Sequence, residues 1–443
     1  MADQVAIIGA GLSGLTLALA LDQQGIRATV YESRPAPLNI GGAVMLSPNA
    51  LKVLDALGLY RHVHDRGFNF DLLEMQQVSG EVIETYEFGG LEKYGYQASR
   101  IYRHELIEIL LSEIQSRGIP VKYGRKYSRV VEETAAQVVW ESTDGTVSRA
   151  SWLVGADGIH SSVRKYLYPA LTPKFTGMVG ISAAVPASQV TGAKPFAKIT
   201  HPLTIVSKNK EKGAFVMAPQ KVDGSELFIG KQRRMAELTR DGWDRFLADK
   251  DGLVKFLRED AEAFGEVGVT ATQDIPHDKV NVWPFYVIPK LDAWASENRR
   301  VVILGDAAHA IPPSAGQGIN QAFEDVYMFS LLLAASTGNG GGGGGGGSGG
   351  DGGSGSGGVV GFEPALAFWQ DYRQDRINKV LELNKQIDLR RLPKPAQKEH
   401  EHEEVEVVAP QEFDLTWLYE PDFRAEVETW IKSAGGSDPG PNT

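Results

Sequence analysis

The chain has 443 residues, too many for one ordinary hydrophobic core, so two or more lobes are expected. The net charge of −11 and the absence of a clear basic patch argue against nucleic acid as a partner. The sequence contains no cysteine, which excludes disulfides, thiolate catalysis and cysteine-ligated metals.

The two ends of the chain show no targeting or membrane signal. MADQVAIIGAG leads directly into an apolar segment without the basic region of a secretory leader. The longest apolar run on the C-terminal side, MFSLLLAA, is far shorter than a membrane span. The acidic run EHEHEEVEVV near residue 399 is interpreted as a solvated loop. We therefore expect a soluble cytoplasmic protein with no membrane span and no metal site.

The first segment has the pattern of a βαβ unit. QVAIIGAG is a short apolar run that ends in glycines, which is typical of a buried parallel strand. LSGLTLALALDQQG follows with helical spacing and stops at Gly25, and IRATVYES predicts the second strand.

Further elements follow with clear start and stop signals. SPNALKVLDALGLYRHV predicts a helix with Ser47 as its cap and Pro48 at the first helical position. RHELIEILLSEIQSRG predicts a helix ending at Gly118, SWLVGADG a strand and turn, and SSVRKYL the start of a helix.

From about residue 175 to 290 short alternating runs predict an antiparallel sheet, with GWDRFLADKDGLVKFLRED as a helical pair within it. RRVVILGD then returns to a buried strand. Two helical patterns follow, GINQAFEDVYMFSLLLAAS and EPALAFWQDYRQDRINKVLELNKQ. Residues 338–358 between them contain sixteen glycines in twenty-one positions, a composition that predicts a disordered surface insertion.

The first loop has the pattern GxGxxG, with Gly9, Gly11 and Gly14 between a strand and a helix. In a dinucleotide site these glycines allow the tight turn, the approach of a pyrophosphate and close helix packing. Glu32, at the end of the second strand, can accept hydrogen bonds from a ribose. A purely structural glycine turn is the alternative, and the motif alone does not distinguish FAD from NAD(P).

Two more motifs narrow this choice. Residues 155–164 read GADGIHSSVR, and residues 304–309 read LGDAAH, followed by a double proline and Gly-Gln-Gly. The three motifs, in this order and spacing, resemble the single-component FAD-dependent aromatic hydroxylases, monooxygenases with the p-hydroxybenzoate hydroxylase fold that include salicylate-hydroxylase-like members. The resemblance covers most of residues 4–385.

The resemblance implies an α/β (α+β) fold: a Rossmann-like FAD-binding domain, an inserted antiparallel-sheet substrate domain and C-terminal helices. The FAD-binding domain would comprise residues 1–70, 97–172 and 290–337. The substrate domain would comprise residues 71–96 and 173–289. Residues 338–358 would be the disordered insertion, and residues 359–443 the C-terminal helical segment and tail.

The resemblance also assigns cofactor contacts. Arg103 would meet the phosphate and ribityl side of the flavin, Asp306 would bind ribityl and pyrophosphate groups, and residues 316–319 would offer amides to the pyrimidine edge of the ring. The complete set of expected FAD-binding residues is Gly9, Gly11, Ser13, Gly14, Glu32, Gly42, Ala43, Arg103, Asp157, Asp306, Pro313, Gly316, Gln317, Gly318, Ile319 and Asn320.

Two assignments stay open. Asp157 and Arg164 either contact the cofactors or form a buried ion pair that holds the turn to its helix. His309 is either a base or, the preferred interpretation, an ordinary loop histidine near the site. No residue is assigned a catalytic role, because the cofactor carries the difficult chemistry.

The implied reaction is oxygen transfer. NAD(P)H, a transient electron donor, reduces FAD. O₂ then forms a flavin C4a-hydroperoxide, which hydroxylates or epoxidises an aromatic or secondary-metabolite-like small molecule. The sequence does not distinguish NADH from NADPH. Another flavin oxidoreductase, a halogenase or a non-catalytic flavin-binding regulator are the alternatives, although VWPFYVIP does not match the halogenase pattern WxWxIP.

The substrate lobe gives one clue to specificity. Several relatives carry an arginine in its first strand, where this chain has Ser182. That difference favours a larger or more neutral substrate. Five residues of this lobe, Phe215, Met217, Trp283, Phe285 and Tyr286, either line a pocket or belong to the core.

Overall fold

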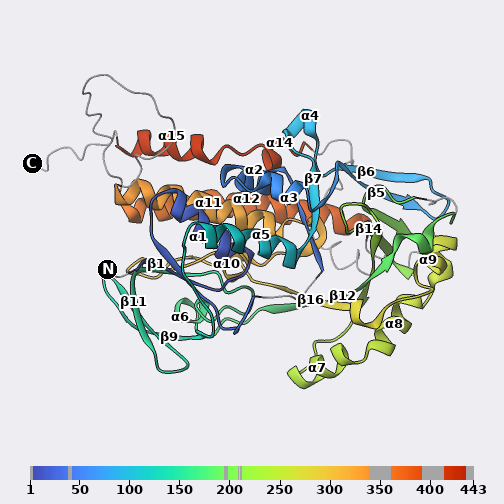
Figure 1. Ribbon diagram of the computed structural model, residues 1–443, viewed down its shortest axis with the longest axis horizontal. Coiled ribbons are helices and arrows are strands. Elements are labelled where there is room, and N and C mark those ends of the chain that lie inside the picture. The colour runs from blue at the N-terminus through green and yellow to red at the C-terminus, as the bar shows by residue number, and fades with distance from the viewer. Residues whose placement is uncertain are drawn as a thin grey trace, which may run out of the picture.

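The computed structural model describes residues 3–37, 42–193, 198–207, 209, 212–338, 361–391 and 414–435. The expected disordered insertion lies outside these ranges except for Gly338, and so does the acidic run near residue 399. The molecule is elongated, with β1 near one end and β14 toward the other (Figure 1).

A mixed seven-stranded sheet, here called the first sheet, contains β1, the first strand of the chain. Its strands are β1 (Asp3–Ile8), β2 (Ala28–Tyr31), β8 (Val121–Lys122), β9 (Tyr127–Glu133), β10 (Val138–Ser142), β11 (Val147–Gly155) and β17 (Val301–Ile303). β1 lies parallel between β2 and β11, and β11 is also parallel to β17. All residues of β2 and β17 are buried, which explains their continuous apolar runs.

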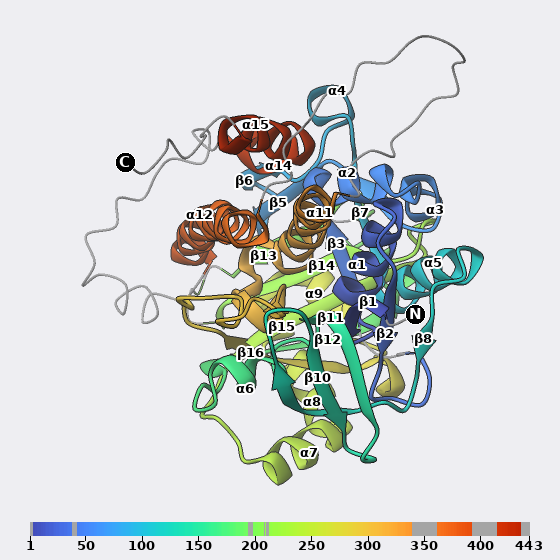
Figure 2. The same cartoon turned by 90° about the vertical axis from the view of Figure 1, so that its left-hand side faces the viewer.

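Helices cover this sheet, and α11 (Gly318–Thr337) lies at their centre. It packs against α1 (Leu12–Gln23), α2 (Pro48–Ala56), α12 (Phe362–Arg391) and α15 (Phe423–Gly435), as Figure 2 shows. The shorter helices of this part are α3 (Tyr60–His64), α4 (Leu91–Tyr94), α6 (Arg164–Leu167), α10 (Asp306–His309) and α14 (Thr416–Tyr419), with the longer α5 (Arg103–Ser116) beside α1. Within the described ranges, no helix has the length and apolar character needed to cross a membrane.

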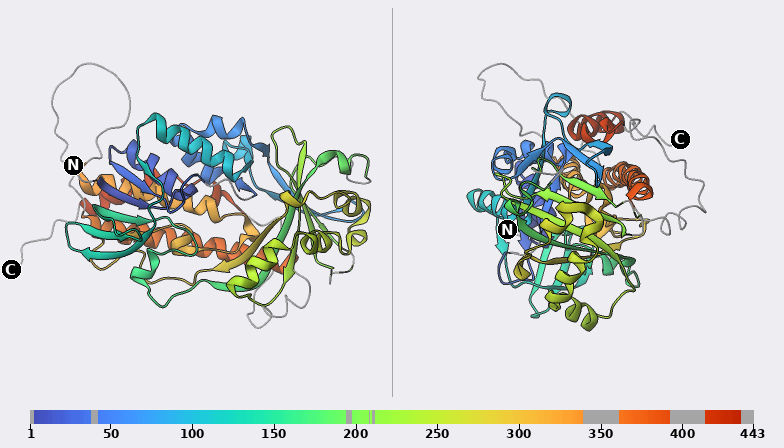
Figure 3. Two further views of the ribbon diagram at one scale, coloured as in Figure 1. Left: turned by 60° about the horizontal axis from the view of Figure 1, so that its bottom comes forward. Right: turned by 90° about the vertical axis from the view of Figure 1, so that its right-hand side faces the viewer.

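The second sheet lies at the other end of the molecule (Figure 3). In spatial order it contains β16 (Asn281–Val287), β12 (Lys174–Pro186), β15 (Glu226–Arg234), β14 (Ala214–Pro219), β13 (Leu203–Val206), β5 (Leu72–Gln77) and β6 (Val82–Glu87). Every pairing is antiparallel except that of β5 with β13. One face packs Ile181 and Ile229 against Leu257 and Phe264 in a separate core.

The helices on that face are α7 (Arg240–Ala248), α8 (Lys250–Arg258) and α9 (Gly265–Ala271). The opposite face turns toward α12 and the loop before α11, where Leu73 and Tyr86 pack with Val380 and Ala315. A small antiparallel sheet joins the two parts and has the order β3 (Ala43–Leu46), β7 (Ala98–Tyr102) and β4 (Phe68–Phe70).

The structure confirms the predicted fold class, with a mixed sheet in one part of the molecule and a mainly antiparallel sheet in the other. The assignment of these parts to cofactor and substrate stays a prediction. Three local details differ from the sequence interpretation. Ser47 occupies the N-cap of α2, but its hydroxyl donates to Asn49 Oδ1 at 2.6 Å and does not cap the helix. The helix after GADG is only four residues long, and β9 and β10 were not foreseen.

Candidate active site

Three loops that are far apart in sequence meet at one edge of the first sheet. β1, β11 and β17 are parallel neighbours, so their carboxyl ends point the same way. Ala156 N donates to Ile8 O at 2.9 Å, and Leu304 N donates to Gly155 O at 3.1 Å. The glycine loop, the GADG loop and the Gly305–Asp306 loop therefore lie side by side, in the position where open α/β sheets bind ligands.

The glycine loop combines close packing with one open position. Gly9 has φ +108°, and a Cβ added there would lie 2.6 Å from the Ala156 carbonyl oxygen. A Cβ at Gly14 would lie 2.0 Å from the Gly9 oxygen. A Cβ at Gly11 would meet no atom within 4 Å. Two glycines thus serve the packing of the chain, and the third borders free space at the start of α1, where a phosphate can approach amide groups.

Glu32 supports this loop from the end of β2. Its side chain is buried, and Oε2 accepts a hydrogen bond from Ala10 N at 2.9 Å. Oε1 accepts from Arg34 N at 2.8 Å and from the Ser33 hydroxyl at 3.0 Å. The carboxylate holds the loop in place and keeps acceptor capacity for a further donor.

Arg103 and Asp306 carry opposite charges in the same region. Arg103 N donates to Gly42 O at 3.2 Å, which fixes the start of α5 beside β3. The Arg103 guanidinium lies 5.6 Å from the centre of the Trp283 ring, and Trp283 is 56% exposed although it is a large apolar residue. The exposed ring and the cation therefore lie side by side where α5 meets β16.

Asp306 begins α10, and its carboxylate has no hydrogen bond to the described residues. Burial raises the pKa of this carboxyl, while His309 and Arg103 act in the opposite direction. Its side chain is nevertheless accessible to solvent. Asp306 therefore has an enclosed but solvent-accessible carboxylate, with acceptors free for hydroxyl groups, and its surroundings are here called the recess.

The N-terminus of α11 provides donors without side-chain caps. The helix begins at Gly318 after the left-handed Gly316, and no side chain caps it. A Cβ at Gly318 would meet no atom within 4 Å. The first amides of a helix lack partners within it, and the helix dipole is positive there. This end of α11 is therefore suited to a polar or negative group.

The side chains of Gln317 and Asn320 point into the protein and do not face this opening. Asn320 Oδ1 accepts from Ser47 N at 3.0 Å, and Asn320 Nδ2 donates to Met45 O at 3.2 Å. Gln317 Nε2 donates to the Ser47 hydroxyl at 3.0 Å. These two expected cofactor residues tie the end of β3 to the start of α11, so only their backbone groups remain for a ligand.

The other expected residues surround the same edge. A Cβ at Gly305 would lie 3.2 Å from Ser13 Oγ, which places Ser13 beside the Gly305–Asp306 loop. Gly42 and Ala43 lead into β3, Ile319 is half-buried in the first turn of α11, and Pro313 is exposed at the start of the short 3-10 turn Pro313–Ala315.

Asp157 and Arg164 bond mainly to backbone groups. Asp157 Oδ2 accepts from Ser162 N at 2.7 Å, and burial raises the pKa of this carboxyl. Arg164 donates to Ala307 O at 2.9 Å and Ile159 O at 2.6 Å. Instead of pairing with each other, the two residues hold the GADG turn and tie it to the loop after β17.

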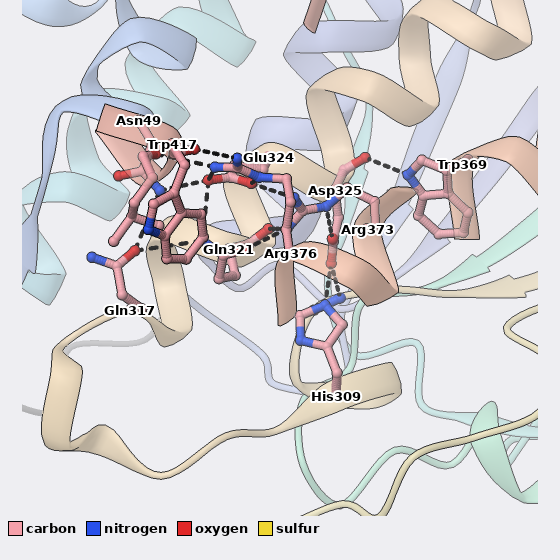
Figure 4. Close-up of polar contacts among 12 residues, drawn as sticks. Asn49, His309, Gln317, Gln321, Glu324, Asp325, Trp369, Arg373, Arg376 and Trp417 are labelled. Atoms are coloured by element: carbon pink, nitrogen blue, oxygen red, sulfur yellow. Dashed lines mark hydrogen bonds and ion pairs between the residues drawn. The ribbon is translucent and has the colours of Figure 1, made fainter. Parts of the chain in front are cut away.

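A buried charge network lies behind these loops, and the sequence analysis missed it (Figure 4). Asp325 is fully buried in α11, and its Oδ2 accepts from Gly305 N at 2.9 Å and lies 2.5 Å from His309 Nε2. Its Oδ1 accepts from Arg373 Nε at 2.7 Å. His309 also packs against the Trp294 ring at 5.1 Å. His309 is therefore held inside the protein at the end of α10, and the choice between a base and an ordinary histidine near the site stays a prediction.

Glu324 anchors the other half of the network. It pairs with Arg373, and with Arg376 through contacts of 2.7 and 2.8 Å. Arg376 also donates to the carbonyl oxygens of Trp417 and Leu418 in α14. Burial acts to raise the pKa of both carboxyls, but the arginines, aided by His309 at Asp325, hold it below the usual value. Two features of the sequence could have revealed this network: the two adjacent acidic residues in the otherwise apolar helix α11, and the two arginines three positions apart in α12.

The five candidate pocket residues of the second sheet do not share one environment. The Phe285 ring lies 3.3 Å from the Cβ position of Gly180. Phe215 and Met217 are buried in the core on the face away from the first sheet. Trp283 lies beside Arg103, and Tyr286 donates to Glu237 at 3.1 Å. Of the five, Trp283 has the clearest position at the recess. The described residues contain no cluster of metal-ligating side chains.

Comparisons with known proteins identify the family of the chain. A family model described as "FAD binding domain" matches residues 2–344. The chain belongs to this family. The 3-amino-4-hydroxybenzoate 2-monooxygenase of Streptomyces cremeus is 30% identical over 330 residues, 73% of this chain and 76% of that protein. The FAD-dependent monooxygenase penM of Penicillium crustosum is 29% identical over 342 residues, 74% and 69% of the two chains.

Solved structures show the same fold over nearly the whole chain. CtdE in complex with FAD and a substrate has a TM-score of 0.73 at 18% identity and covers 98% of both chains. A variant of HpxO from Klebsiella pneumoniae complexed with FAD has a TM-score of 0.70 at 21% identity, with 98% of this chain and 99% of that chain covered. The predicted family, its FAD cofactor and the oxidoreductase class are confirmed.

The two packed glycines and the open one predict different substitution effects. Gly14→Ala would force a Cβ against the Gly9 oxygen, and overpacking of this kind costs about 1–3 kcal/mol. Gly11→Ala meets open space, so it should preserve stability while weakening FAD binding. Urea unfolding of flavin-free protein and FAD titration measure the two effects. Equal stability losses in both variants would contradict this reading of the loop.

A substitution in the buried charge network should greatly lower the free energy of unfolding. Arg373→Met would leave two buried carboxylates short of a partner, which typically costs about 3–5 kcal/mol. Lys379→Met, on the same helix, removes an exposed pair with Asp375 and a distant contact with the Trp417 ring, and it serves as the control. Urea unfolding compares them, and an Arg373 variant as stable as the control would show that the network is not needed.

Proposed function

We propose that the chain is an FAD-dependent monooxygenase that uses NAD(P)H and O₂ to hydroxylate or epoxidise an aromatic or secondary-metabolite-like small molecule. The observation that carries the proposal is the convergence of the glycine loop, the Gly305–Asp306 loop and the N-terminus of α11 around one recess. Two relatives that are named as monooxygenases, 29% and 30% identical to this chain, support the reaction class.

The residues present fit FAD. The open space at Gly11 and the free amides at the start of α1 suit the pyrophosphate. Glu32 would accept from the adenosine ribose, and Asp306 from the ribityl hydroxyls, with Arg103 near the phosphates. The uncapped amides at residues 317–319 would face the pyrimidine edge, where the positive end of α11 would stabilise negative charge.

Bound FAD, reduced by NAD(P)H, supplies the activation of O₂ that delivers one oxygen atom to the substrate. The chain's own part is to orient the substrate and exclude water. The second sheet turns one face toward the recess, and Trp283 lies there beside Arg103. A closed apolar wall at this position would limit loss of the activated oxygen to water.

We assign residues 1–70, 97–172 and 290–337 to cofactor binding, and residues 71–96 and 173–289 to substrate binding. The pairing of β5 with β13 supports this division, because it brings residues from the first of the two substrate segments into the sheet of the second. The main chain passes from the first part into residues 71–96 and back again at the small sheet, between β4 and β7.

Asp306→Ala tests the cofactor assignment. Loss of charge-assisted hydrogen bonds should weaken FAD binding by about 10- to 100-fold while the protein stays folded. Asp251→Ala, at an exposed position on α8, serves as the matched control and should keep its FAD. The ratio of flavin absorbance to protein absorbance after gel filtration measures retention. Full FAD retention in the Asp306 variant would refute the assigned role.

The reaction class is tested by a substrate screen with the FAD-loaded protein. Oxidation of NADH and NADPH should accelerate with a true substrate, and the product should contain one oxygen atom from ¹⁸O₂. Peroxide release measured in the same samples separates coupled from uncoupled turnover. Turnover that requires halide and yields a halogenated product would establish a halogenase instead, and FAD binding without any turnover would favour a non-catalytic protein.

A further inference from the structure

Arg100, on β7, is buried without an acidic partner in the described part of the chain. Its side chain is 6% exposed, and the guanidinium lies 4.8 Å from the centre of the Phe228 ring. Nη2 donates to Gln220 Oε1 at 3.3 Å, and Nε has no partner. Burial lowers the pKa of Arg100 to about 10, which reflects the missing counter-charge.

The neighbouring polar groups do not neutralise this cation. Gln220 Nε2 donates to the Tyr102 hydroxyl at 2.9 Å, and that hydroxyl donates to Glu226. The Glu226 carboxylate is therefore engaged by Tyr102, and it forms no ion pair with Arg100. Leaving a guanidinium buried with only a neutral amide as partner is costly for the folded protein.

Strand register places Arg100 beside the recess. It pairs directly with Met45 across β3 and β7, and residues paired in this way project from the same face. The Met45 methyl group lies 3.3 Å from the Cβ position of Gly316, in the loop before α11. Arg100 is thus linked through one side chain to the loop that we assign to the pyrimidine edge of the flavin.

On its other side Arg100 faces the second sheet. The Phe228 ring lies within 2.9 Å of the Cβ position of Gly230, and Gly230 pairs with Ser182. The residues that pair with Arg100 on its two neighbouring strands, Met45 and Phe68, pack in an apolar cluster with Phe70 and Phe88. Arg100 is therefore a buried cation without an acidic partner in the described part of the chain, with aromatic walls formed by Phe68 and Phe228 and with the loop before α11 nearby.

We propose that Arg100 determines substrate specificity by binding a carboxylate carried on an aromatic substrate. This inference rests on the proposed function and deepens it. It replaces the expectation of a neutral substrate that was based on Ser182, because the cation comes from β7 instead of β12. A bound carboxylate would supply the counter-charge that Arg100 lacks, and the aromatic walls would hold the ring.

The test uses matched pairs of an aromatic acid and its amide, such as 4-hydroxybenzoate with 4-hydroxybenzamide and indole-3-acetate with indole-3-acetamide. Members of a pair have nearly the same shape and differ in charge. Each is titrated into FAD-loaded protein, and changes in flavin absorbance give the dissociation constant. At least one acid should bind wild-type protein about 10-fold or more tightly than its amide, as expected for a charge-assisted hydrogen bond.

Three variants make the result specific. Arg100→Met should abolish the preference for the acid, and Arg100→Lys should restore part of it, with unchanged FAD content in both. Arg245→Met removes an exposed arginine on α7 and should leave the preference intact. A purely structural role of Arg100 would alter stability without changing the ratio of the two dissociation constants.

The outcomes separate this inference from the proposed function. FAD content, measured before any ligand is added, tests the function by itself. FAD-loaded wild-type protein that binds no acid, or binds acids no better than amides, would overturn the role of Arg100. So would a preference for acids that survives in Arg100→Met.

Discussion

The recess depends on two buried carboxylates in α11. Glu324 and Asp325 are fully buried, and charges in such a place are tolerated only with close partners. Arg373 and Arg376 of α12 supply these partners. Since Asp325 also accepts from Gly305 N, the ion pairs that hold the helices together also fix the loop that presents Asp306.

The same network explains why the C-terminal helices matter for the site. Arg376 donates to carbonyl groups in α14, and Glu324 accepts from Asn49, which contacts Gln317 at the start of α11. Helices from both ends of the chain therefore converge on α11. The free end of that helix and the adjacent loop thereby become parts of one recess, and five of the seven strands of the second sheet lie in sequence between β11 and β17.

The sequence was informative where function requires local patterns. The glycine loop and the Gly305–Asp306 loop could be recognised because a strand, a tight turn and a helix follow within a few residues. The ion network was not recognised, because Arg373 and Glu324 are 49 residues apart and pair only after α11 and α12 pack. The side-chain contacts of Gln317 and Asn320 were not foreseen for the same reason, since their partner Ser47 lies about 270 residues away.

Substrate recognition shows a further limit of sequence reasoning. Ser182 pointed to the loss of a cation on β12, and that inference was local. Arg100 could be proposed as a replacement for that cation only from the register of β3 with β7 and from its contact with Phe228. A charged residue in a short strand gives no sign in the sequence that it will be buried without a partner.

The central claim is that loops almost 300 residues apart in sequence form one FAD site and not two nucleotide sites. Isothermal titration of flavin-free protein with FAD tests it directly, with ADP-ribose as a competitor for the adenine half. The account predicts one FAD per chain and full competition between the two ligands. Two independent sites, or simultaneous binding of FAD and ADP-ribose to one chain, would contradict it.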